Sequence, residues 1–249
     1  MSEQRSGSPA LRPAYYAAGP GRLRDWWTLL HPPYTAWHLS YVVIGAALAP
    51  RVSTSRLVAT LLAFFCAVGL SAHALDELKG RPLRTSIPSG VLVAATLVGL
   101  VAAVAFGIAG VVEVGWVLVP FIVAGPLLVV AYNAELFGGF VHTDAGFALA
   151  WGAFPVLTAY VAQAENLGPA PVIAAVGAFC LSYSQRALST PARLIRRRVT
   201  GVEGNLVLSD GSTVVIDERF LIRPLERALS ALSWSTVLFA AALAVAKLG

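Results

Sequence analysis

The sequence predicts an all-α integral membrane protein, a bundle of about seven transmembrane helices with a small cytoplasmic β-hairpin before the last helix. Of the 249 residues, 57% are hydrophobic and only 12% are charged, roughly half the charged fraction of a soluble domain. The hydrophobic residues also gather in long runs between polar loops. Because a soluble fold cannot bury so much apolar surface, we expect lipid to surround most of the chain.

Seven segments are candidates for crossing a bilayer, which takes roughly 20 mainly apolar residues. Prolines such as Pro120, Pro126 and Pro155 interrupt several of them. A helix bundle tolerates such prolines because neighbouring groups satisfy the freed carbonyls. The expected spans cover residues 33–50, 57–76, 87–110, 114–133, 144–163, 169–189 and 228–247.

The basic residues predict the orientation. With the N-terminus in the cytoplasm, only Arg51, Arg56 and Lys247 of the 18 Lys and Arg residues fall outside, in agreement with the positive-inside rule. We therefore expect a multi-pass protein of the plasma membrane with its C-terminus outside. The net charge of +5 does not indicate nucleic acid, because the basic residues lie in loops between spans rather than on one folded surface.

The chain divides into four expected parts. Residues 1–24 are rich in Ser, Gly, Pro and Arg and lack the apolar run of a signal peptide, which predicts a disordered cytoplasmic tail. The transmembrane bundle covers 25–198 and the last helix 226–249. Between them, residues 199–225 carry β-branched residues on both sides of Asp210-Gly211, a dipeptide typical of two-residue hairpin turns. This hairpin is expected to cap the bundle or to dock a protein partner.

Ionisable residues gather at three cytoplasmic junctions, after the second, fourth and sixth spans. Because placing an ionisable side chain at membrane depth costs free energy, each of these residues is a candidate for function. At the first junction, His73 stands three and four residues before two acids, so on a helix the imidazole shares a face with a carboxylate. This junction contains His73, Asp76, Glu77, Lys79, Arg81 and Arg84.

The other two junctions differ in charge. The second has acids, an amide and an imidazole but no Lys or Arg, which is typical of a loop that meets a cation or a basic partner; its candidates are Tyr132, Asn133, Glu135, His142 and Asp144. The third forms a cationic rim suited to an anionic lipid or a diphosphate, and contains Tyr183, Arg186, Arg193 and the run Arg196 to Arg198. Two structural alternatives remain open: the arginine run as a topology anchor, and His38, inside the first span, as a hydrogen-bonding group in helix packing.

The first junction also carries a family resemblance. Its acids end the second span and are followed by Arg81-Pro82 and then by Ile87-Pro88-Ser89-Gly90. This stretch resembles the first Asp-rich motif and following loop of the UbiA-type intramembrane prenyltransferases. The layout of polar motifs after spans two, four and six is similar too, over roughly residues 30 to 195. In that family, acids of two Asp-rich motifs hold Mg²⁺ against a prenyl diphosphate, and basic residues bind the phosphates.

The resemblance implies a UbiA-like prenyltransferase that moves a prenyl group from a prenyl diphosphate to a lipid-phase acceptor with Mg²⁺. Residues 182–190 contain no acid, so acids and imidazole of the second junction are expected to replace the second motif. The expected catalytic residues are Asp76, Glu77, Tyr132, Glu135 and Asp144. The expected substrate-binding residues are Lys79, Arg81, Arg84, Asn133, Tyr183, Arg186 and Arg193. The expected metal ligands are His73, Asp76, Glu77, Glu135, His142 and Asp144.

Two other functions remain open. Imidazoles suit a transition metal better than Mg²⁺, which would make the chain a different intramembrane metal enzyme. Alternatively, it is a non-catalytic membrane component that holds a lipid or quinone and docks a partner through the hairpin. Besides membrane lipids, the expected small-molecule partner is a prenyl diphosphate or another isoprenoid lipid.

Overall fold

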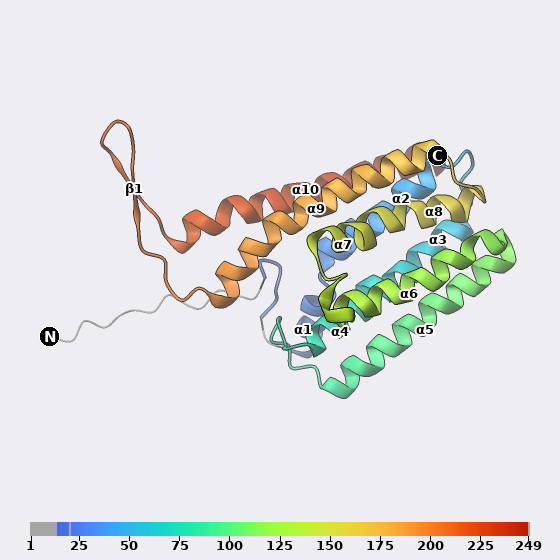
Figure 1. Ribbon diagram of the computed structural model, residues 1–249, viewed down its shortest axis with the longest axis horizontal. Coiled ribbons are helices and arrows are strands. Elements are labelled where there is room, and N and C mark those ends of the chain that lie inside the picture. The colour runs from blue at the N-terminus through green and yellow to red at the C-terminus, as the bar shows by residue number, and fades with distance from the viewer. Residues whose placement is uncertain (1–13, 20, 249) are drawn as a thin grey trace.

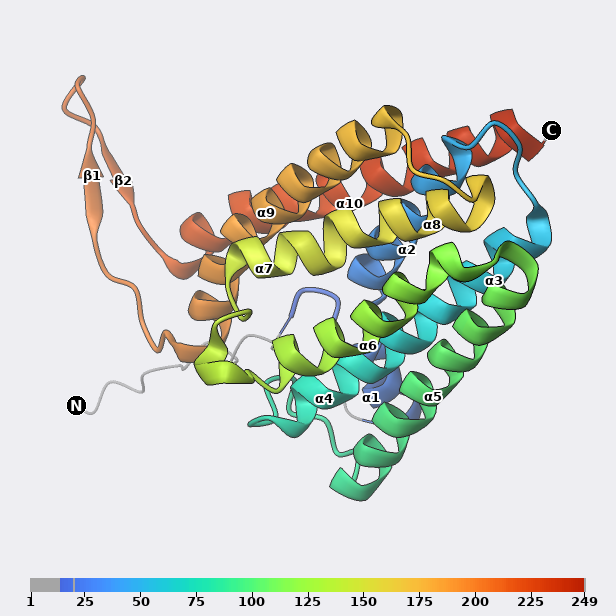
Figure 2. The ribbon, with the colours of Figure 1, turned by 45° about the vertical axis from the view of Figure 1, so that its right-hand side comes forward.

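Long helices pack side by side, and a β-hairpin projects from one end of the bundle (Figures 1 and 2). The computed structural model describes residues 14–19 and 21–248. We call the end that carries the hairpin, α1 and α4 the hairpin end. In chain order the elements are α1 (Arg22–Leu29), α2 (Pro32–Ala47), α3 (Thr54–Phe64), η1 (Phe65–Ala72), α4 (His73–Leu78), α5 (Ser89–Val114), η2 (Trp116–Leu118), α6 (Val119–Asn133), η3 (Phe137–Gly139), α7 (Asp144–Ala148), η4 (Leu149–Ala153), α8 (Phe154–Ala164), α9 (Pro169–Arg198), β1 (Asn205–Val207), β2 (Thr213–Val215) and α10 (Glu218–Leu248).

Within the described residues, five helices are long and apolar enough to cross a membrane. They correspond to five of the seven expected spans, and they cover Thr54–Leu78, Ser89–Val114, Trp116–Asn133, Asp144–Ala164 and Glu218–Leu248. α2 has 16 residues, fewer than the roughly 20 that a crossing takes, and the second half of α9 is polar. The mainly helical bundle with its small hairpin is therefore confirmed, whereas the count of seven spans stays a prediction.

The outward face of α5 is apolar. Val98, Val101 and Val112 on this helix are 63%, 68% and 83% exposed. In water, a large contiguous apolar face of this kind marks a surface that something else covers. Lipid tails would cover it without cost, since they are themselves apolar.

Glycines bring two pairs of helices unusually close. A Cβ at Gly45 of α2 would lie 2.2 Å from the carbonyl oxygen of Val156 in α8. A Cβ at Gly152 of η4 would lie 2.6 Å from the carbonyl oxygen of Ala178 in α9. Small residues let helix backbones approach in membrane bundles, so these two glycines determine how α2 and α9 pack against the α7–η4–α8 helix.

The N-terminal segment, residues 14–19, packs on the hairpin end. The Ala18 N–H donates to Thr28 Oγ1 at 3.0 Å, and the Tyr16 hydroxyl is hydrogen-bonded to His31 Nδ1. α1 then begins at Arg22. The described residues up to 24 thus make specific contacts and begin a helix, where the sequence predicts a disordered tail through residue 24. Residues 1–13 of that predicted tail lie outside the described residues.

The predicted hairpin is present, with a longer loop than expected. β1 and β2 are antiparallel, with Leu206 opposite Val214. The Leu208 N–H donates to Ser212 O at 2.8 Å, so the loop has three residues, 209–211, and Gly211 adopts its positive φ of 83° there. Such three-residue loops with a left-handed glycine are common. α10 begins at residue 218, so the last helix starts inside the region expected to belong to the insertion, 199–225.

Candidate ligand-binding site

A polar cavity of about 460 Å³ lies at the hairpin end, and we call it the chamber. The N-terminal segment, α2, α4, α6 and α9 all contribute to its walls. Side chains from all three polar junctions meet here. Of the residues expected to be catalytic, substrate-binding or metal-ligating, nine line the chamber: His73, Asp76, Lys79, Tyr132, Asn133, Glu135, His142, Arg186 and Arg193.

Glu77, an expected metal ligand, holds a loop instead of lining the chamber. Its carboxylate is fully buried and accepts three hydrogen bonds at 2.9 Å, from the Leu83 N–H, the Thr85 N–H and the Thr85 hydroxyl. The Arg81 guanidinium donates to Ser89 Oγ at 2.7 Å in the same loop. Glu77 and Arg81 therefore shape the connection between α4 and α5.

Three more of the singled-out residues lie outside the chamber lining. Arg84 is exposed. Tyr183 stacks on Phe179, with 6.3 Å between ring centroids. Asp144 Oδ1 accepts a hydrogen bond from Arg186 Nε at 2.9 Å, so this acid orients a chamber guanidinium without facing the cavity.

α9 supplies a cationic wall. Arg186, Arg193 and Arg197 follow one another at intervals of seven and four residues, which places them on one helix face, and all three line the chamber. In total the lining holds six Lys or Arg side chains and three Asp or Glu side chains. The chamber therefore has an excess of positive charge and suits an anionic group.

Two of the three acids that line the chamber form ion pairs with basic side chains. Lys79 Nζ lies 2.6 Å from Glu135 Oε2, and this hydrogen bond lowers the pKa of Glu135 below its usual value. Glu226 pairs with Arg196. Among the described residues, no group of three His, Cys, Asp or Glu side chains could hold a metal ion. The six expected metal ligands therefore do not form the oxygen-rich cluster that a protein-bound Mg²⁺ takes, nor an imidazole cluster for a transition metal.

All four histidines of the chain line the chamber. The ring of His31 stacks on that of His73, with 4.3 Å between centroids and 19° between planes. Tyr16 and Tyr34 surround this pair, with their rings 5.3 and 6.4 Å from that of His31. His31 and Tyr16 carry little signal in the sequence: an aromatic pair near the N-terminus and a histidine directly before two prolines. They are therefore not among the residues that the sequence predicts for the site.

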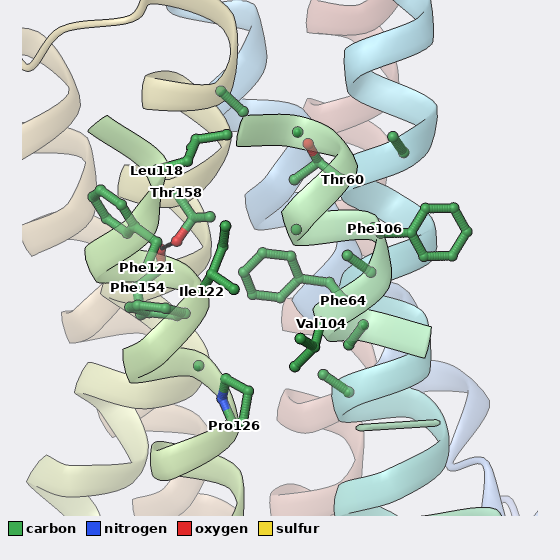
Figure 3. Close-up of a pocket in the computed structure, with 18 of the residues that line it drawn as sticks. Thr60, Phe64, Val104, Phe106, Leu118, Phe121, Ile122, Pro126, Phe154 and Thr158 are labelled. Carbon is green, nitrogen blue, oxygen red and sulfur yellow. Dashed lines mark hydrogen bonds between the residues drawn. The ribbon is translucent and has the colours of Figure 1, made fainter. Parts of the chain in front are cut away.

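A second, apolar cavity of about 320 Å³ runs between α3, α5, α6 and α8, and we call it the groove. Phe64 and Ile122 approach each other across it, and Phe154 lines it as well (Figure 3). Val68 and Trp151 line both the groove and the chamber. The two cavities therefore adjoin at these two side chains.

Fold and site together define a helical bundle, with helices long and apolar enough to cross a membrane, in which a cationic chamber adjoins an apolar groove. An amphiphile with an anionic head group and a hydrocarbon tail matches both cavities. No protein-family model, curated protein or solved structure matches the chain. The physical features of the two cavities therefore carry the functional assignment.

Proposed function

We propose that this chain is a UbiA-like integral membrane protein that binds a prenyl diphosphate and transfers its prenyl group to an acceptor in the lipid phase. The observation that carries the proposal is that chamber and groove adjoin at Val68 and Trp151. A prenyl diphosphate has the same two parts, a multiply charged head group and an apolar tail.

The cationic wall of α9 suits the diphosphate. A guanidinium group binds phosphate oxygens through two parallel N–H donors, and α9 presents Arg186, Arg193 and Arg197 to the chamber. When the prenyl carbon–oxygen bond breaks, its electron pair leaves with the diphosphate, and these guanidinium groups stabilise the added negative charge. The Tyr132 and Trp151 rings, with centroids 5.9 Å apart, line the chamber near its junction with the groove, where aromatic rings would stabilise the allylic cation.

The length of the groove suits a tail of three to four isoprene units. Val68 and Arg56 line the groove twelve residues apart, which corresponds to roughly 18 Å of helix. An extended isoprene unit of four carbon–carbon bonds spans roughly 5 Å. Farnesyl and geranylgeranyl diphosphate are therefore the first substrates to test.

In the proposed orientation, the hairpin end faces the cytoplasm and α2 and α9 complete the seven spans in the plasma membrane. The basic chamber and the hairpin then lie on the side of the membrane that the positive-inside rule assigns to basic residues. Water-soluble diphosphate would also leave the chamber on that side.

The test is binding of farnesyl thiodiphosphate, a non-reacting analogue, to the protein in lipid nanodiscs, followed by turnover of farnesyl diphosphate with and without Mg²⁺. Arg193→Gln is expected to weaken binding about tenfold, as for loss of a hydrogen-bonded charge. Arg223→Gln is the matched control, because Arg223 is an exposed arginine of α10 outside the chamber lining. If the wild-type protein binds neither farnesyl nor geranylgeranyl analogues, the proposal is wrong.

A second candidate function is binding of the same amphiphile without chemistry. The observation in its favour is that the described acids form no metal cluster, since intramembrane prenyl transfer of the UbiA type uses such acids. Tight binding of farnesyl thiodiphosphate together with unchanged farnesyl diphosphate after prolonged incubation, with and without Mg²⁺, would select this alternative.

A further inference from the structure

Three of the four imidazoles in the chamber have a fixed tautomer. Each places Nδ1 within hydrogen-bonding distance of a backbone carbonyl oxygen: His38 to Trp151 at 3.0 Å, His73 to Gly69 at 3.0 Å and His142 to Tyr132 at 2.9 Å. A carbonyl oxygen carries no proton, so Nδ1 must be the donor. In a neutral imidazole of this tautomer, Nε2 holds a lone pair and acts as an acceptor.

The backbone itself produces this arrangement. η1 and η4 are π-helical, and their wider turns change the partners of their carbonyl groups. The carbonyls that hold His73 and His38 belong to Gly69 in η1 and Trp151 in η4. Both irregular segments therefore orient a histidine of the same chamber, which is consistent with the frequent occurrence of π-helical turns at functional sites.

Further polar atoms of the chamber lack partners. His31 Nε2, Tyr132 Oη and Gln185 Oε1 are buried and make no hydrogen bond within the described part of the chain, and all three residues line the chamber. Tyr132 and Gln185 are each only 5% exposed. Because native proteins rarely leave buried polar atoms unpaired, these atoms are available to hydrogen-bond water or a ligand in the chamber.

Among the four histidines, His73 is best placed to accept a proton. Its ring stacks on His31, and Asp76 stands three residues later in the same helix and lines the same chamber, where it can balance the charge of an imidazolium. His142 Nε2 instead lies 4.0 Å from Glu135 Oε1, and His38 is almost completely buried.

We propose that His73 is a catalytic residue whose Nε2 lone pair binds the protic group of the prenyl acceptor and takes up the proton that the acceptor loses. The step rests on the proposed function. The prenyl carbon–oxygen bond breaks and its electron pair leaves with the diphosphate. The acceptor forms a bond to the prenyl carbon with the electron pair of its former bond to hydrogen, and the proton moves to His73 Nε2.

The hydrogen-bond acceptor role of His73 Nε2 is tested by ligand binding without turnover. The result is therefore independent of whether prenyl transfer occurs. The probes are dihydroxynaphthalene, which has hydroxyl donors, and dimethoxynaphthalene, which has the same rings but no donor. The wild-type protein in nanodiscs is expected to bind the dihydroxy compound about tenfold more tightly. His73→Asn should remove this preference, because the Asn amide replaces Nδ1 but not Nε2, whereas His73→Gln should restore part of it through an oxygen near the Nε2 position.

Ser184→Ala serves as the control, because the Ser184 hydroxyl donates to Cys180 O at 2.9 Å on the exposed side of α9. If His73→Asn does not fold, nitrogen NMR of the labelled wild-type protein provides the second measurement. The resonance of His73 Nε2 should have the chemical shift of an unprotonated nitrogen. It should shift when dihydroxynaphthalene is added but not when dimethoxynaphthalene is added. Equal binding of both probes by the wild type, or a protonated Nε2, overturns the assignment even if farnesyl thiodiphosphate binds.

Discussion

Replacing Glu77 by Gln is expected to destabilise the fold rather than to impair the chemistry. The carboxylate accepts three hydrogen bonds in a fully buried site. A Gln amide must turn its NH₂ group toward either the Leu83 N–H or the two donors of Thr85, so one or two hydrogen bonds are lost and donors face each other. With about 1.5–3 kcal/mol for each hydrogen bond to a charged group, the expected loss is about 1.5–6 kcal/mol of unfolding free energy.

The assay is unfolding of the purified protein in mixed micelles at increasing SDS fraction, followed by tryptophan fluorescence. Asp76→Asn is the matched control, since Asp76 is adjacent in sequence but lines the chamber. This control should change stability by less than about 1 kcal/mol and should instead alter ligand binding. A Glu77→Gln protein as stable as the wild type but unable to bind or turn over farnesyl diphosphate would refute the loop-holding role and restore Glu77 as a ligand-binding residue.

Three other outcomes follow from the fold. Gly45→Ala should lower the unfolding free energy by about 2 kcal/mol or more, because the alanine Cβ would lie 2.2 Å from a backbone carbonyl oxygen. The control is Gly177→Ala, whose Cβ would have nothing within 4 Å. It should be neutral or stabilising by up to about 1 kcal/mol. Because burial lowers the pKa of His31 in the folded state, its contribution to stability is complete above the unfolded value of about 6.5 and is lost as the pH falls below it. His31→Asn should therefore flatten the decrease in unfolding free energy between neutral and acidic pH, and an unchanged slope would contradict this assignment. In a cysteine-free background, Ser209→Cys should react with a membrane-impermeant maleimide only after the cells are opened, and Asn166→Cys should react in intact cells; the reverse pattern would invert the proposed orientation.

The convergence of the polar junctions could be predicted from the sequence, because an ionisable side chain next to lipid is stable only where other polar groups or water meet it. His73, Asp76, Glu135 and His142 accordingly line one chamber. The roles of adjacent residues could not be predicted in the same way. Asp76 and Glu77 are both acids in the same motif, and only the path of the following loop decides that the second of them is buried under backbone N–H donors.

The remaining features depend on contacts that leave little local signal. π-helical turns have no sequence pattern comparable to a helix cap, so the carbonyls that orient His38 and His73 could not be anticipated. The composition of the N-terminal segment predicts a polar, flexible chain. The hydrogen bond between Tyr16 and His31 depends on the packing of α1 and α2, which composition does not specify. The groove follows from the way separate spans cross, which apolar periodicity alone does not specify.

The attachment of the N-terminal segment has a consequence for access to the chamber. Residues 14–19 form no helix of their own, and they contact the bundle through the Tyr16 hydroxyl, the Ala18 N–H and the rings of Tyr15 and Tyr16 beside Tyr34. Segments outside regular secondary structure open locally at lower free energy than packed helices do. If this short segment detaches, a water-soluble molecule reaches the imidazoles from the aqueous side while every long helix stays in place. Amide hydrogens of residues 14–19 should then exchange with solvent well before those of α2.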